Sequence, residues 1–399
     1  MDRHIERFAD LVVRAGVNVQ PGQGVVVDTD TAHLEIARAV VEAAYAAGAA
    51  WVEPNWSDGP MQRSAVDHLT VGQLSASRPW ALTRINEWRD AGVASIALTG
   101  DADPHLFDGA DPARVAARRH EEIQARRRAL FDGMRWCVVA APNPGWARQI
   151  FGEPDTERLW AAVSTAMRLE ADDPVAAWRD RSATLATRAQ QLDKLELTEV
   201  RYTGDGTDLT VGLLPQTRWT GGGLVDRFGI DYLPNIPTEE VFTSPDRGRA
   251  DGVIRVTRPM VILGQLVTGL RVTFEGGTIV EATADQGADV IRAQLATDEG
   301  ALRLGEVSLV DRDSRIAKAG IVFHNTLYDE NAGCHVAWGQ SFPFAVAGGP
   351  AMTEQERADL GLNMSGIHTD VVIGGDGITV TGTGPQGTAT IIRNDEWVL

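Results

Sequence analysis

Hydrophobic positions in the first half of the chain follow helical and strand-like patterns in turn. Near the start, Ile5, Phe8, Leu11 and Val12 fall on one face of a helix over residues 2–15. Further on, short apolar runs predict strands and alanine-rich stretches predict helices, in the order 25–28, 31–46, 50–54, 94–98, 112–130 and 136–141. Strand, helix and strand in this order indicate right-handed parallel crossovers. We therefore expect an α/β domain with a parallel sheet.

The composition and the hydrophobic periodicity of the chain change after residue 193. Two helical stretches occupy 154–193, and from Val200 onward Thr, Val and Gly dominate short alternating runs that are separated by turns such as 275–277. Such runs are typical of antiparallel hairpins. We expect an N-terminal α/β domain over 1–193 and a mixed, largely antiparallel α+β domain over 194–399, which would carry any metal site.

Composition narrows the possible partners. The chain has 399 residues and a formal net charge of −18, which disfavours nucleic acid and attracts cations. Its two cysteines exclude a disulfide framework, and Cys334 is expected to be a small buried residue. The first residues lack the apolar core of a signal peptide, and no run approaches the roughly 20 apolar residues that span a bilayer. A cytoplasmic protein without a membrane partner is expected.

Four segments of the second half combine carboxylates with histidines. They carry Glu239 and Glu240, Glu306, His324 and His335, and His368 and Asp370. On a strand, His368 and Asp370 would share one face, although the pair taken alone is more typical of a protein surface than of a metal site.

Glu306 is the most informative of these residues because it lies in an apolar run. A buried carboxylate costs several kcal/mol, roughly, unless a cation or hydrogen bonds compensate it. A salt bridge to Arg303 is the alternative. The adjacent Glu239 and Glu240 would point in opposite directions on an extended segment, so only one of them can reach a shared site.

Two glutamates, two histidines and an aspartate suffice for two closely spaced divalent ions. Such a pair activates a water molecule and polarises a scissile carbonyl. The chain has no HExxH motif, so spacing alone does not settle the chemistry.

At these segments the sequence resembles the thermophilic aminopeptidase family, that of aminopeptidases T and S and PepS, over nearly the whole chain. The most specific match is Asn-Ile-Pro-Thr-Glu-Glu-Val-Phe-Thr-Ser-Pro at 235–245. Further matches follow in the family's order at 304–306, 326–332, 335–339 and 368–370.

The resemblance implies a metallo-aminopeptidase, a hydrolase that removes N-terminal residues from peptides. It implies two divalent ions, zinc, cobalt or magnesium, and a cytoplasmic homodimer. The metal ligands would be Glu240, Glu306, His335, His368 and Asp370. Either Glu240 or Glu306 would be the general base.

One position departs from the family. Where the family has a tyrosine near the metals, this chain has Phe342, which keeps the ring and loses the hydroxyl. If that hydroxyl stabilises the tetrahedral intermediate, its loss costs about 10²–10³ in rate. Tyr328 or His324 could supply a donor instead, or the substrate could be a specialised one.

Two other functions stay open at this point. His335, His368 and Asp370 also form a two-histidine, one-carboxylate set, which suits a mononuclear iron(II) dioxygenase of the dihydroxypyridine type. A specialised or inactive peptide-binding relative is the second alternative. The presence of both Glu240 and Glu306 favours the peptidase, whereas the missing tyrosine slightly favours the dioxygenase.

Overall fold

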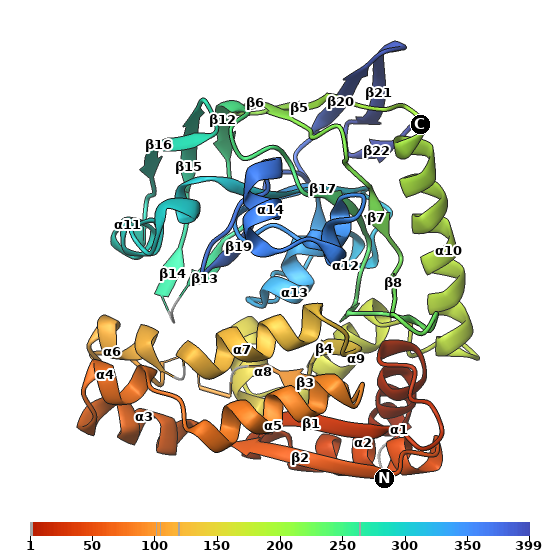
Figure 1. Cartoon of the computed structure of the whole chain (residues 1–399), viewed down its shortest axis with the longest axis vertical. Coiled ribbons are helices and arrows are strands. Elements are labelled where there is room, and N and C mark those ends of the chain that lie inside the picture. Colours follow the sequence, from red (N-terminus) through yellow and green to blue (C-terminus); the bar gives the residue numbers. More distant parts are fainter. Residues whose placement is uncertain (1–2, 101, 104, 119, 263–264) are drawn as a thin grey trace. The chain divides into compact units, whose positions relative to one another are not determined.

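The chain forms two compact units. The computed structural model describes residues 3–100, 102–103, 105–118, 120–262 and 265–399. One unit comprises Met1–Asp180 with Gly223–Pro237, and the other comprises Arg181–Gly222 with Thr238–Leu399. Figure 1 shows both, coloured along the sequence.

A five-stranded sheet forms the centre of the first unit. Its strand order is β10-β4-β3-β1-β2, and all its pairings are parallel. The strands are β1 (Gly24–Asp30), β2 (Trp51–Ser57), β3 (Ala94–Thr99), β4 (Trp136–Ala140) and β10 (Asn235–Ile236). Because β2 and β3 flank β1 on opposite sides, right-handed crossovers place the intervening helices on opposite faces of the sheet. Val25, Val26 and Val27 are accordingly buried.

Helices account for most of the remaining first unit, with one short hairpin. The helices are α1 (Arg3–Leu11), η1 (Val12–Gly16), η2 (Thr31–His33), α2 (Leu34–Ala46), α3 (Gly59–His68), α4 (Val71–Ser75), α5 (Pro79–Asp90), α6 (Pro112–Ala117), α7 (His120–Phe131), α8 (Pro144–Phe151) and α9 (Thr156–Ala166). The hairpin joins β8 (Leu224–Val225) and β9 (Asp231–Tyr232).

The second unit contains two antiparallel sheets. The five-stranded sheet has the order β19-β18-β17-β11-β7, and the eight-stranded sheet has the order β16-β15-β12-β6-β5-β20-β21-β22. The first comprises β7 (Thr220–Gly221), β11 (Glu240–Thr243), β17 (Leu304–Val310), β18 (His335–Gly339) and β19 (His368–Val372). The second comprises β5 (Glu199–Gly204), β6 (Thr207–Gly212), β12 (Ala250–Arg255), β15 (Arg271–Glu275), β16 (Thr278–Thr283), β20 (Thr379–Gly384), β21 (Gly387–Arg393) and β22 (Glu396–Trp397).

Short elements complete this unit. They are the hairpin β13 (Met260–Ile262) and β14 (Gln265–Val267), and the helices α11 (Ala288–Leu295), η3 (Glu299–Leu302), α12 (Arg315–Ala319), α13 (Thr326–Asp329), η4 (Glu330–Ala332), η5 (Pro343–Ala345), η6 (Gly349–Ala351) and α14 (Glu354–Leu360). The expected fold class, a parallel α/β part followed by a largely antiparallel part, is confirmed.

The core of the second unit lies between its two sheets. Val307, Leu309, Val336, Trp338 and Val371 of the five-stranded sheet join one buried cluster with residues of the eight-stranded sheet. Because strand side chains alternate, the positions between them point to the opposite face. That opposite face carries the candidate carboxylates and histidines.

The compact units divide differently from the expected boundary at residues 193 and 194. Helix α10 (Pro174–Asp193) crosses from one unit to the other, since its Leu185, Ala189 and Leu192 belong to the core of the second unit. The segment Gly223–Pro237 returns to the first unit, where β10 pairs with β4. Among the helices that the structure describes, none is long and apolar enough to cross a membrane.

Candidate metal centre

Four strands of the five-stranded sheet bring the acidic and histidine side chains onto one face. Glu306 of β17 pairs with Ala337 of β18, which pairs with Asp370 of β19. His335 and His368 each lie two residues before a member of this row, so they share its face.

Small residues leave space on this face. Ala337 separates Glu306 from Asp370, and Ser308 pairs with His335. Gly339 pairs with His368 and adopts φ +101°, and a Cβ at this position would lie 2.3 Å from the carbonyl oxygen of Ile367. The main chain of Ile367 thus excludes a side chain at residue 339, whereas the small side chains of Ala337 and Ser308 leave room between the imidazoles and carboxylates.

Glu306 lies between the two imidazoles. Its Oε1 is 3.9 Å from His335 Nε2, and its Oε2 is 3.2 Å from His368 Nε2. On either side, Glu240 Oε2 is 3.1 Å from His335 Nε2, and Asp370 Oδ1 is 3.3 Å from His368 Nε2. All five sequence-predicted candidates are therefore brought together.

Both imidazoles are oriented by main-chain carbonyls. His335 Nδ1 lies 3.3 Å from the oxygen of Gly333, and His368 Nδ1 lies 2.8 Å from that of Gln340. A neutral ring that donates from Nδ1 has its lone pair on Nε2, and here that atom faces carboxylates. Acceptors that converge in this way require a proton or a cation between them.

The pKa shifts of Glu306 and His335 also reflect this convergence of acceptors. Burial raises the pKa of Glu306 to about 7, against the opposing effect of His368. Burial alone would lower the pKa of His335, but the hydrogen bond and charge of Glu240, with the charges of Glu306 and Asp370, raise it to about 10. The group is thus held together by protons that a divalent ion can replace.

Two sets of ligand atoms have the closeness that a metal ion needs. Among the residues that the structure describes, these sets are Glu240, Glu306 and His335, and Glu306, His368 and Asp370. Within each set the ligand atoms lie within 4.8 Å of one another. Because Glu306 belongs to both, the donors fit two neighbouring ions that share one carboxylate.

Comparison with known proteins identifies the family. The profile of the thermophilic metalloprotease family (M29) matches residues 1–397. The chain belongs to the M29 metalloprotease family. The resemblance expected from the sequence is thereby confirmed, as is a metal-dependent peptidase.

Similar M29 proteins match along their full length. Aminopeptidase T of Thermus aquaticus is 36% identical over 405 residues, covering 99% of this chain and 98% of that protein. Aminopeptidase PepS of Streptococcus thermophilus is 35% identical, with the same coverage. The structure of wild-type AmpT from Thermus thermophilus superimposes with a TM-score of 0.90 at 34% identity, covering 100% of this chain and 99% of that one. These matches do not favour the dioxygenase alternative.

The adjacent glutamates of this M29 protein point in opposite directions, as expected. Glu240 faces the histidines and accepts a hydrogen bond of 2.6 Å from Ser308 Oγ. Glu239 points away and forms an ion pair with Arg181, at 2.6 Å between Oε2 and Nε. Arg303, the alternative ion-pair partner expected for Glu306, instead lies near Glu299, with 3.9 Å between its Nη2 and Glu299 Oε1.

One buried carboxylate of the M29 site was not singled out from the sequence. Burial raises the pKa of Glu330 well above its usual range, and the nearby charges of Asp370 and Glu240 raise it further. Glu330 begins η4, in a polar stretch that looks solvent-exposed from its composition. Its position within the Asp-Glu-Asn segment that resembles the family was the only signal.

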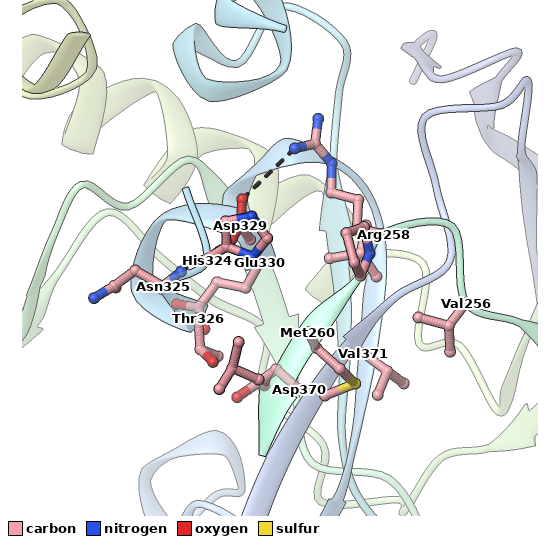
Figure 2. Close-up of a pocket in the computed structure, with 13 residues that line it drawn as sticks. Val256, Arg258, Met260, His324, Asn325, Thr326, Asp329, Glu330, Asp370 and Val371 are labelled. Atoms are coloured by element: carbon pink, nitrogen blue, oxygen red, sulfur yellow. Dashed lines mark hydrogen bonds and ion pairs between the residues drawn. The ribbon is translucent and has the colours of Figure 1, made fainter. Parts of the chain in front are cut away.

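A small cavity borders the site. It has a volume of about 30 Å³, room for a water molecule, and its lining includes Asp370, Glu330 and His324. Figure 2 shows these side chains, with the ion pair between Arg258 and Asp329 at 3.6 Å. Of the two expected substitute donors, His324 lines this cavity, whereas Tyr328 is fully buried against Phe323.

Phe342, where the resemblance to the family implies a tyrosine, lies beside His368. Its ring centroid is 4.8 Å from that of His368. Cys334, by contrast, is fully buried and donates to the carbonyl oxygen of Val310, in agreement with a packing role.

Proposed function

We propose that this protein is an aminopeptidase that removes N-terminal residues from peptides with the help of two divalent ions. The ligands would be Glu240, Glu306 and His335 for one ion, and Glu306, His368 and Asp370 for the other. The observation that carries the proposal is the position of Glu306, with one oxygen toward each imidazole. The relatives named above, which are aminopeptidases, supply the reaction.

The ions, zinc, cobalt or magnesium, would lower the pKa of a water molecule and polarise the scissile carbonyl when bound. The chain itself must then accept the proton of the attacking water and donate one to the leaving amine. The expected acceptors are Glu240 and Glu306, and the buried Glu330 joins them because it lines the cavity next to Asp370. The free ammonium of the peptide would bind among these carboxylates.

A homodimer and a cytoplasmic location complete the proposal. Both rest on the resemblance to the family. The coarser statements, a metal-dependent peptidase and a peptide substrate, follow from membership of the M29 family.

The decisive experiment combines a leucyl anilide assay with metal analysis. We expect activity in the presence of zinc or cobalt, with two ions per chain, and a loss of about 10³-fold or more in Glu306→Gln. Glu299→Gln is the matched control, because Glu299 is largely exposed and lies outside the site. Among the glutamine variants at Glu240, Glu306 and Glu330, the one that retains metal and loses rate identifies the proton acceptor.

Two results would contradict the proposal. Equal rates for the wild type and Glu306→Gln would remove Glu306 from the site. One iron per chain together with oxygen consumption would replace the hydrolase with the dioxygenase.

A further inference from the structure

Three phenylalanines form a continuous apolar surface at the edge of the metal centre. The rings of Phe342 and Phe344 are nearly parallel, with centroids 5.2 Å apart and an interplanar angle of 19°. Phe242 meets both edge-on, at 5.6 Å and 6.1 Å. All three remain partly exposed. We call Phe242, Phe342 and Phe344 the phenylalanine wall.

The strand register fixes the wall on the same side of the sheet as the metal centre. Phe242 lies two residues after Glu240 on β11 and pairs with Ser308 of β17, so it shares the face of both. The main chain of Phe342 is held by Ser244, whose Oγ accepts its N–H at 2.9 Å. Phe242 thus lies on a strand of the sheet, and Phe342 and Phe344, at the start of η5 (Pro343–Ala345), are tied to the end of that strand through Ser244.

The wall lies beside the more exposed part of the candidate metal centre. The side chains of His335, Glu240 and Glu306 are only 1%, 8% and 4% exposed, whereas those of His368 and Asp370 are 17% and 12% exposed. Phe342 packs directly against the imidazole of His368, the most exposed of the five. A peptide that reaches the centre beside His368 therefore meets these rings.

Partly exposed aromatic rings next to a strongly acidic centre create two contrasting environments. The carboxylates attract an ammonium group, and the rings gain free energy by burying apolar surface. The N-terminal residue of a peptide offers both groups on one carbon atom, its α-ammonium and its side chain.

We propose that the phenylalanine wall binds the side chain of the substrate's N-terminal residue and selects apolar side chains there. The inference rests on the proposed aminopeptidase function, since it assigns a specificity to that same site. Phe242 and Phe344 supply the contact surface, and Phe342 connects this surface to His368.

Paired dipeptides test the assignment. We expect wild-type protein to hydrolyse leucyl-glycine at least 10-fold faster, in kcat/KM, than lysyl-glycine, glutamyl-glycine or glycyl-leucine. Phe344→Ala lowers kcat/KM for leucyl-glycine about 10-fold and changes glycyl-leucine less than about two-fold, while Phe344→Leu restores most of the preference. Phe228→Ala is the matched control, because Phe228 is 65% exposed in the first unit.

Other outcomes overturn the inference. A loss confined to glycyl-leucine would assign the wall to the residue after the scissile bond, and an equal loss for all dipeptides would reduce it to a structural role. A wild-type preference for lysyl-glycine would show that the rings bind a cation.

Absence of hydrolysis in the wild type would contradict the proposed function separately. In that case, calorimetry on zinc-loaded protein compares the affinities for leucine amide and glycine amide and so tests the role of the phenylalanine wall. Tighter binding of leucine amide that is lost in Phe344→Ala supports the inference, and equal affinities contradict it.

Discussion

At the scale of single residues, one position along a strand decides between a structural and a chemical role. Glu239 and Glu240 are neighbours, yet Glu239 pairs with Arg181 and Glu240 joins the histidines. Strand alternation predicted that only one could reach the site. The choice of Glu240 came from the resemblance to the family, because the pairing of β11 with β17 is a contact between distant segments that spacing does not contain.

Glu330 shows the limit of reading single residues. From the sequence it lies in a polar turn, where a carboxylate is usually solvated. Its burial arises when β19 and η4 pack together in the second unit, which brings Asp370 near. No local pattern carries that information.

Ser308 is expected to tune the metal affinity, because its hydroxyl orients the carboxylate of Glu240. Removing an outer hydrogen bond of this kind typically lowers metal affinity 10–100-fold. We expect Ser308→Ala to raise the zinc Kd by about that factor, measured by competition with a chromophoric chelator. Ser95→Ala, a buried serine of the first unit, should leave it unchanged. An unaltered Kd in Ser308→Ala would contradict this role.

Both thiols are expected to be inert in the native protein. Cys137 and Cys334 are fully buried, and burial raises the pKa of Cys334 to about 12. The thiolate is the reactive form, so it is scarce at pH 8. Ellman's reagent should detect no thiol before denaturation and both afterwards. Rapid reaction of one thiol in the folded protein would show that its site opens.

At the scale of elements, the short alternating runs after Val200 predicted the largely antiparallel character of the second unit. In the structure, the side chains of β17, β18 and β19 alternate between a core face and a polar face. Strand β10 was not predicted, because its two residues carry no periodic signal and it pairs with β4 far away in sequence. The sequence also did not predict that α10 extends from one unit into the other, because the periodicity of a helix does not show which residues its faces contact.

Helix α10 should contribute to stability through one buried ion pair. The side chains of Arg181 and Glu239 are only 13% and 0% exposed. Arg181→Met removes the ion pair of a buried carboxylate, which we expect to lower the free energy of unfolding by about 3 kcal/mol. Urea denaturation followed by circular dichroism measures this. Arg201→Met removes a largely exposed pair with Asp208 and should change little, so similar effects of both substitutions would contradict the argument.

At the scale of the whole molecule, the protonation of the metal centre links stability to pH. In protein stripped of metal, the folded pKa of His335, about 10, exceeds its ordinary value of 6.5. The stabilisation is complete below pH 6.5 and is lost as the pH rises to about 10. The folded pKa of Glu306, about 7, exceeds its ordinary 4.5, so stability also falls between these values as this carboxyl ionises.

Both groups give the same sign, so chelator-treated protein should unfold at a lower temperature at pH 9 than at pH 6. With zinc, the unfolding temperature should instead rise from pH 6 to pH 9. At the higher pH the ligands have already lost their protons, so fewer protons must leave when the ion binds. Differential scanning calorimetry across this range measures both effects. His335→Gln should flatten the pH dependence without metal, and an unchanged slope in that variant would assign the effect to other groups.

The candidate ligands lie on four strands, from Glu240 on β11 to Asp370 on β19, the last of the four along the chain. During synthesis on the ribosome, the segments with Glu240, Glu306 and His335 therefore emerge before the proposed ligand set is complete. If these residues bind the ions as proposed, a growing chain would be unable to cut the peptides around it until the last strand of the sheet has formed.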